Sequence, residues 1–347
     1  MSNYYISQIQ ERDTRRNQQM NDLLVQENIR RDALLDYSCG LFDEDQLIAT
    51  GSCYGNTLRC LAVSSDHQGE ALMNQIISHL IEIQFARGNT HLFLYTKDSS
   101  APFFGSLGFY EIARIKNQLV FMENRKTGFS TYLKGLAAES KSGAKTAAIV
   151  MNANPFTLGH RYLVDKAAAE NDVLHLFMVS EDVSLIPFAV RKRLILEGTA
   201  HLKNLVYHDC GPYIISNATF PSYFQKDEAA VIEGHARLDL TIFIQIARTL
   251  GITCRYVGEE PFSQVTGIYN TIMTTELPEA GVECVVIPRL ESDGQAISAS
   301  TVRNAIKQHD LEGLSRLVPA STLDYLCSAE AAPVIEKIRT ADDVIHY

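Results

Sequence analysis

Short apolar runs alternate with helical stretches over the second half of this chain. The run TAAIVM, residues 146–151, contains no charged residue and is typical of a parallel strand buried on both faces. Further candidate strands lie at 173–180, 204–208, 254–260 and 282–289, and candidate helices at 159–170, 187–202, 238–251 and 300–308. This alternation predicts a doubly wound parallel sheet, a Rossmann-like α/β fold that binds ligands beyond the carboxyl ends of its strands.

The residues before this alternation follow a different pattern. Residues 47–63 alternate like a β-hairpin, and residues 69–88 place Leu72, Ile76 and Leu80 on one helix face. A strand at 91–96 and a short helix, glycine turn and strand over 101–115 are expected to follow. This mixture predicts an α+β domain.

The length and one polar segment divide the chain. At 347 residues it is long enough for about two domains. The segment AAESKSGAKT, residues 137–146, is small and polar, as linkers are. We therefore expect a first domain over residues 1–136, a linker over 137–146 and a second domain over 147–347.

Charge and cysteine usage exclude several classes of protein. The formal net charge is −10, which argues against bulk binding to nucleic acid or anionic membranes. No apolar run approaches the roughly 20 residues that span a bilayer, and the first residues lack an apolar signal core. Seven scattered cysteines without a CxxC pair predict reduced thiols and no protein-bound metal site. We expect a cytoplasmic protein.

The turn NANPFTLGH, residues 152–160, lies where the first parallel strand meets its helix. Exposed backbone N–H groups and the helix dipole make such a turn an anion site. Pro155 stiffens the loop, Thr157 can cap the helix, and Gly159 lets the backbone approach a phosphate. His160 can donate a hydrogen bond or a charge to phosphate oxygens. Alone, the turn fits a structural cap as well as a nucleotide loop.

A second turn, ISASTVR at 297–303, favours the nucleotide site. Ser298, Ser300 and Thr301 stand where N-caps and phosphate ligands stand, and Arg303 is expected in the first helical turn. A cation there opposes the helix dipole, so a purely structural arginine should be replaceable with no loss of thermal stability. Two anion-binding helix starts in one α/β domain indicate a nucleotide-binding site.

The two turns resemble the motifs of the HxGH nucleotidyltransferase superfamily. The first motif matches Asn152, Pro155, Thr157, Gly159 and His160, and the second matches Ser298, Ser300, Thr301 and Arg303. The resemblance implies that the domain binds ATP with Mg²⁺, that a nucleophile attacks the α-phosphorus, and that His160, Arg303 and Thr157 are catalytic. Gly258, at a later strand end, is expected to contact the adenosine. The loop at 180–188 lacks the lysine of many adenylyltransferases, so phosphate neutralisation should depend on Arg303, His160 and Mg²⁺.

The first domain resembles the GNAT acyltransferase fold in residues 61–77 and 103–112. Gln68 and Gly69 match the loop that cradles the coenzyme A pyrophosphate in that fold, whereas Ala71 and Met73 replace residues that are usually smaller or glycine. We therefore expect a retained fold without its own transferase activity. Gln68 and Gly69 are possible contacts for a coenzyme-A-like prosthetic group.

A GNAT-like domain followed by an HxGH domain, at this length, resembles the citrate (pro-3S)-lyase ligase family. The resemblance implies an AMP-forming acid–thiol ligase that uses ATP and acetate. Its acceptor is the thiol of a phosphoribosyl-dephospho-coenzyme A group on the acyl-carrier subunit of citrate lyase, and acetylation activates the lyase. Two alternatives stay open: an adenylyltransferase with a phosphopantetheine- or nicotinamide-nucleotide-like acceptor, and a nucleotide-sensing regulator.

Overall fold

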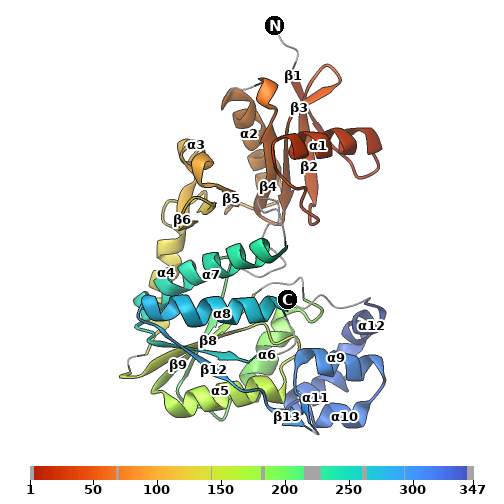
Figure 1. Ribbon diagram of the computed structural model, residues 1–347. Helices are drawn as coiled ribbons and strands as arrows, with labels where there is room; N and C mark the ends of the chain where they lie inside the picture. The colour runs from red at the N-terminus through yellow and green to blue at the C-terminus, as the bar shows by residue number, and fades with distance from the viewer. Residues whose placement is uncertain are drawn as a thin grey trace. The chain divides into compact units, whose positions relative to one another are not determined.

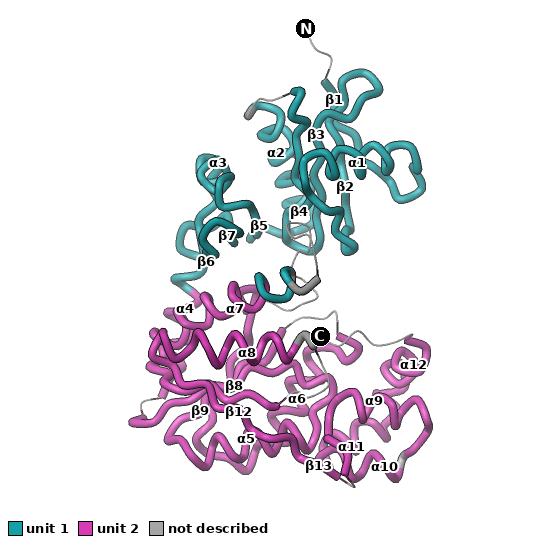
Figure 2. The backbone as a smooth tube through the Cα atoms, in the orientation of Figure 1, with its two compact units in different colours: residues 1–131, 220–234 teal, residues 132–219, 235–347 magenta. Residues whose placement is uncertain are grey.

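The computed structural model describes residues 4–67, 70–141, 143–180, 184–214, 228–259, 264–292 and 294–341. The chain forms two compact units (Figure 2). Unit 1 comprises residues 1–131 and 220–234, and unit 2 comprises residues 132–219 and 235–347. Each unit has its own sheet and core.

Unit 1 contains a seven-stranded sheet in the order β1-β2-β3-β4-β5-β7-β6. All neighbouring strands are antiparallel except β4 and β5. The strands are β1 (Tyr4–Gln8), β2 (Tyr37–Asp43), β3 (Gln46–Tyr54), β4 (Thr57–Val63), β5 (Phe93–Lys97), β6 (Tyr110–Ile115) and β7 (Leu119–Glu123). The helices are α1 (Thr14–Gln26), α2 (Glu70–Ala86), α3 (Ala101–Ser106) and the start of α4 (Gly128–Glu139).

The sheet of unit 1 lies between α1 and α2. Leu24 of α1 packs in one core cluster with Phe42, and Leu80 of α2 packs in another with the adjacent Leu41. Because successive strand residues point to opposite faces, the two helices cover opposite faces of the sheet. Alternation of apolar residues on both faces therefore specifies this layered α+β unit.

Unit 2 contains a five-stranded, fully parallel sheet in the order β10-β9-β8-β11-β12. Figure 1 labels its strands β8, β9 and β12. Its strands are β8 (Thr146–Met151), β9 (Val173–Met178), β10 (Leu205–Asp209), β11 (Cys254–Gly258) and β12 (Glu283–Ile287), with a small ribbon of β13 (Glu291–Ser292) and β14 (Gln295–Ala296). The chain order reverses between β8 and β11. Such a switch point is where doubly wound sheets bind their ligands.

Helices cover both faces of this sheet. The helices of this part of the chain are α5 (Leu158–Glu170), α6 (Phe188–Gly198), α7 (Glu228–Leu250), α8 (Gln264–Glu279), α9 (Ala299–Lys307), α10 (Leu311–Ser315), α11 (Ala320–Leu326) and α12 (Ala332–Thr340). Residues 228–234 of α7 belong to unit 1, α10 and α12 pack against α9, and α11 packs against α6. Ile149 shares a buried cluster with residues of α5, α6 and α9. On the opposite face, the Arg255 guanidinium lies 4.3 Å from the ring centroid of Phe243 in α7. The sheet is therefore buried on both sides, as its apolar strands predict.

The predicted fold class, an α+β domain followed by a doubly wound parallel sheet, is confirmed by the strand order of the two units. The structure adds elements that the sequence analysis did not identify, among them β1, β2, α4 and α8. The proposed linker at 137–146 overlaps the end of α4, and the units divide between Thr131 and Tyr132, so the domain limits stay a prediction. Within the described residues, no helix combines the length and apolar character needed to cross a membrane.

Candidate active site

The loop after β8 leads into α5 through a capping box. Thr157 is the N-cap: its hydroxyl oxygen accepts a hydrogen bond from the His160 backbone N–H at 3.2 Å. In return, the Thr157 backbone N–H donates to Nδ1 of His160 at 3.1 Å. Thr157 is 1% exposed, and its buried hydroxyl caps the N-terminus of α5. Because the contacts join residues three apart, the local sequence alone dictates this arrangement.

These contacts decide the tautomer of His160. Nδ1 accepts the Thr157 N–H, and the Thr157 hydroxyl also lies 2.8 Å from it, so the proton of the neutral ring is on Nε2. Burial, together with the positive charges of Arg289 and Arg303, lowers the pKa of His160 from 6.5 to about 4. At neutral pH His160 is therefore an uncharged donor through Nε2–H. Of the two roles predicted for it, hydrogen bond or charge, the geometry supports the hydrogen bond.

Two donors at this helix start have no partner within the described residues. The first N–H of α5, that of Leu158, donates to the Leu317 carbonyl at 2.9 Å, and the third is taken by Thr157. The second, that of Gly159, donates to no described atom, and neither does Nε2 of His160. Helix-start N–H groups of this kind bind anions. The α5 start therefore offers two neighbouring donors for an anionic ligand.

The second predicted turn packs directly against the first. A Cβ atom on Gly159 would lie 2.6 Å from the carbonyl oxygen of Ile297. Glycine is therefore required because the Ile297 backbone approaches so closely. The absence of a Cβ is predicted from the sequence to let a phosphate approach; in the structure it is the Ile297 backbone that approaches.

Arg303 joins the two motifs through its guanidinium. Nη1 donates to the Asn154 carbonyl at 2.7 Å, and Nη2 donates to the Ser300 hydroxyl at 3.0 Å. Arg303 is 7% exposed and is the fifth residue of α9 after the Ser298 N-cap, so it lies beyond the first turn in which we expected it. Because of these contacts we now expect that replacing Arg303 lowers stability, in contrast to the expectation from the sequence. Its removal would leave a carbonyl without its donor.

The hydroxyls of the second motif are used within the turn. The Ser298 oxygen accepts the Thr301 backbone N–H at 3.0 Å, and the Thr301 hydroxyl donates to the Ala296 carbonyl at 3.1 Å. The Ser300 hydroxyl oxygen accepts from Arg303. These contacts orient the α9 start and its arginine.

Arg289 is a further cation that the sequence analysis missed. It follows β12, and its Nε donates to the carbonyl of Glu259, the residue after β11, at 2.7 Å. Its charge acts on His160. The sequence feature that could have identified Arg289 is its position just after Pro288 and an apolar strand. Parallel strands bring residues at that position to the same edge of the sheet as the α5 start.

Gly258 and Pro155 occupy opposite kinds of environment. Gly258 ends β11, its carbonyl accepts from the Asn270 side chain at 3.1 Å, and a Cβ there would meet nothing within 4 Å. Space for a ligand at this strand end is thus compatible with the predicted adenosine contact. Pro155 is buried in the loop between Asn154 and Phe156 and serves packing.

Asn152 is held by a buried arginine that was also missed. Nη1 of Arg191, on α6, lies 2.7 Å from the Asn152 side-chain oxygen and 2.8 Å from its carbonyl oxygen. The Asn152 amide also donates to the Ser184 hydroxyl at 3.2 Å. The run RKR in α6 gave no sign of which of its three cations faces inward.

The two residues predicted to contact a prosthetic group, Gln68 and Gly69, lie outside the described residues. The neighbouring Met73 packs against the core of unit 1. In the described part of the chain, no cluster of three or more His, Cys, Asp or Glu residues could hold a metal ion.

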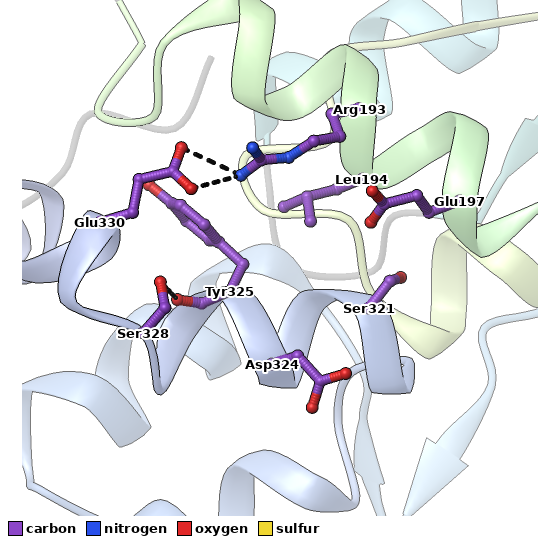
Figure 3. Close-up of a pocket in the computed structure, with 8 residues that line it drawn as sticks. All are labelled: Arg193, Leu194, Glu197, Ser321, Asp324, Tyr325, Ser328 and Glu330. Carbon is purple, nitrogen blue, oxygen red and sulfur yellow. Dashed lines mark hydrogen bonds and ion pairs between the residues drawn. The ribbon is translucent and has the colours of Figure 1, made fainter.

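A hollow of about 470 Å³ opens elsewhere on unit 2, between α6 and α11 (Figure 3). Arg193 bonds both carboxylate oxygens of Glu330 there, at 2.9 and 3.0 Å. Arg193 and Arg191 are two positions apart on α6 and so point to different sides of the helix. None of the predicted site residues lines this hollow, so it is separate from the α5 start.

The matching family model and the most similar sequences point to one family. Residues 146–326, about half of the chain, match the model of the citrate lyase ligase C-terminal domain. The citrate (pro-3S)-lyase ligase of Escherichia coli K12 is 42% identical over 289 residues, which cover 82% of each chain. That of Klebsiella pneumoniae is 39% identical over 82% of this chain and 84% of its own. That of Haemophilus influenzae is 37% identical over 87% of this chain and 92% of its own.

Among solved structures, that of Escherichia coli ElaA covers 36% of this chain and 100% of its own, with 14% identity and a TM-score of 0.32. We therefore base the fold of unit 1 on its own strand order. The family assignment rests on the sequence matches, which extend well beyond the two motifs. The chain belongs to the citrate lyase ligase family.

Proposed function

We propose that this protein is an acid–thiol ligase that activates citrate lyase by ATP-dependent acetylation. Its acceptor is the thiol of the coenzyme-A-like prosthetic group on the acyl-carrier subunit of the lyase. Acetate first attacks the α-phosphorus of ATP, forming acetyl-adenylate and releasing pyrophosphate. The prosthetic thiolate then attacks the acetyl carbonyl, and AMP leaves.

The need for an adenylate follows from acetate itself. A carboxylate cannot acylate a thiol directly, because oxide would be the leaving group. Adenylation of acetate makes AMP the leaving group, which is stable. The protein's task is to hold the phosphates and to stabilise the charge that develops on them, which is electrostatic preorganisation.

The site residues can be given roles on this basis. The Gly159 N–H and Nε2–H of His160 would donate to phosphate oxygens, and Arg303 and Arg289 would supply positive charge. Thr157 acts through His160, whose tautomer it fixes, and is a positioning residue. Mg²⁺ would arrive with ATP, and Gly258 would lie against the adenosine. The observation that carries the proposal is the pair of donors at the α5 start, with no described protein partner, beside two arginines.

The cellular setting is part of the proposal. ATP, acetate and the carrier subunit meet in the cytoplasm, and all seven cysteines of the chain are free thiols. Reduced cysteines fit that compartment.

One incubation tests the function directly. The purified protein is mixed with MgATP, radiolabelled acetate and deacetylated citrate lyase, and the lyase subunits are then separated. We expect label on the acyl-carrier subunit, AMP and pyrophosphate as products, and recovery of lyase activity. Absence of label on deacetylated lyase that chemical acetylation can reactivate would refute the proposal.

Pyrophosphate exchange separates this function from its alternatives. Acetate-dependent exchange between pyrophosphate and ATP identifies the ligase. Exchange that requires a phosphopantetheine- or nicotinamide-nucleotide-like acceptor identifies an adenylyltransferase. MgATP binding without any exchange identifies a regulator.

A further inference from the structure

Arg191 is one of the largest fully buried side chains of the protein. It lies in α6 and is 1% exposed, whereas its neighbours Lys192 and Arg193 pair with carboxylates at the surface. Burying a guanidinium is costly unless its hydrogen bonds are satisfied. Its hydrogen bonds therefore indicate which parts of the fold Arg191 holds in place.

The guanidinium binds three separate backbone segments. Nε donates to the Ile186 carbonyl at 3.0 Å, just before α6. Nη1 lies 2.8 Å from the Val179 carbonyl oxygen, after β9, and contacts both oxygens of Asn152, after β8. Arg191 thus ties together the ends of two neighbouring parallel strands and the start of the next helix.

The loop that Arg191 holds is the one that leads into the α5 start. Arg303 holds the same loop from α9, through the Asn154 carbonyl. Between them, Ala153 has a φ of +49°, a left-handed conformation that residues with a Cβ rarely adopt. The side-chain oxygen of Asn154 also accepts the Ile186 N–H at 3.1 Å. The loop is therefore clamped between two buried guanidinium groups.

We propose that Arg191 is a positioning residue for nucleotide binding: through Asn152 it holds the 152–154 loop so that the α5 donors and Arg303 face the phosphates. The proposal rests on the proposed function only in that the α5 start binds a nucleotide. Lysine would not replace it fully, because one ammonium group cannot reproduce the geometry of the guanidinium fork.

The test compares Arg191→Met, Arg191→Lys and Asn152→Ala with Lys192→Met. The control removes one positive charge from the adjacent residue, whose partner is the exposed Asp209. Folding is checked by circular dichroism, MgATP binding by the ligand-induced rise in Tm, and catalysis by acetate-dependent pyrophosphate exchange. We expect Arg191→Met to raise the KM for MgATP and to lower kcat/KM by about tenfold or more. Arg191→Lys should recover part of the lost kcat/KM. Lys192→Met should match the wild type.

Asn152→Ala keeps the test decisive if Arg191→Met does not fold. It removes only one acceptor of the clamp, so it should weaken MgATP binding in the same direction while the protein stays folded. Where the Arg191 and Asn152 variants can be combined, their joint effect should be smaller than the product of the single effects, because they disrupt one contact.

Two results would overturn the inference. One is normal MgATP binding and exchange in a folded Arg191→Met protein or, if that variant does not fold, in Asn152→Ala. The other is a lower Tm with unchanged KM and kcat per folded molecule. A wild-type protein that binds MgATP but never acetylates citrate lyase would refute only the proposed function, since the effect of Arg191 on MgATP binding could still be measured.

Discussion

The two ring nitrogens of His160 differ in their contacts: Nδ1 closes the capping box of α5, and Nε2–H is a donor with no partner among the described residues. His160→Ala removes the outward donor and should lower the rate of acetyl-adenylate formation by about a hundredfold, the scale of losing one charge-stabilising donor. Pyrophosphate exchange measures this rate. His201→Ala, which removes an exposed histidine paired with Asp165, is the matched control and should leave the rate of acetyl-adenylate formation unchanged. A folded His160→Ala protein with a normal rate would reduce His160 to a helix cap.

Arg303 should show both a structural and a catalytic loss. Arg303→Ala leaves the Asn154 carbonyl without its donor in a buried contact, so we expect the free energy of unfolding to fall by about 1–3 kcal/mol. Acetyl-adenylate formation should fall at least about tenfold, and Arg303→Lys should recover part of it. Urea unfolding and single-turnover kinetics measure the two effects. Normal kinetics in the folded fraction would leave Arg303 with a structural role only.

Alanine substitution at two glycines of the candidate site should affect stability differently. Gly159→Ala places a methyl group 2.6 Å from the Ile297 carbonyl oxygen and should destabilise the protein and separate the two motifs. Gly258→Ala meets no described atom within 4 Å and should leave the Tm of the free protein unchanged. If adenosine lies against Gly258, this variant should still raise the KM for ATP. An unchanged KM would remove Gly258 from the site.

At the scale of elements, β9 and β10 share a buried histidine pair. Nδ1 of His175 lies 2.8 Å from Nε2 of His208, and the two residues are 0% and 2% exposed. Burial lowers the pKa of each from 6.5 to about 4. A carboxylate oxygen of Glu139, on α4, lies 3.7 Å from Nδ1 of His208. The strands are therefore joined by a pair that is stable only while neutral.

This pair predicts loss of stability in mild acid. Because the folded-state pKa values lie below 6.5, the unfolded chain binds more protons, and stability is lost as the pH falls from 6.5 toward 4. The slope is at most about 1.4 kcal/mol per pH unit for each histidine. Urea unfolding at several pH values should show a shallower slope for His175→Gln and His208→Gln than for the wild type. His201→Gln, at the surface, should keep the wild-type slope; equal slopes in all four proteins would contradict the prediction.

At the scale of the whole molecule, the resemblance of the first domain's sequence to the GNAT fold raises the question of a second activity. Met73, which stands in place of a smaller residue in the resemblance, packs against the core of unit 1. We expect the full-length protein to transfer no acetyl group from acetyl-coenzyme A to amines without ATP. Mass spectrometry of a panel of amine substrates measures this, with a competent acetyltransferase as control. Robust acetylation without ATP would show that unit 1 has kept a transferase site.

The strands, helices and helix caps of unit 2 could largely be predicted from the sequence alone. Strand–helix alternation predicted the parallel sheet, because burial on both faces demands continuous apolar strands. The caps at Thr157 and Ser298 were predicted for the same kind of reason, since each bonds a residue three positions later. The family resemblance likewise rested on short motifs whose members are neighbours in sequence.

What the sequence could not show is how the two motifs meet. The Arg303–Asn154 contact spans 149 positions and the Arg191–Asn152 contact spans 39, and no periodicity encodes either of them. From sequence alone, Arg303 is therefore predicted in an open first turn, and neither Arg191 nor Arg289 is identified as a site residue. Whether an arginine is a surface charge or a buried clamp depends on which carbonyl groups the packed elements bring to it. Only the tertiary structure decides that, because unpaired carbonyls at strand ends become hydrogen-bond partners once the sheet and its helices are assembled.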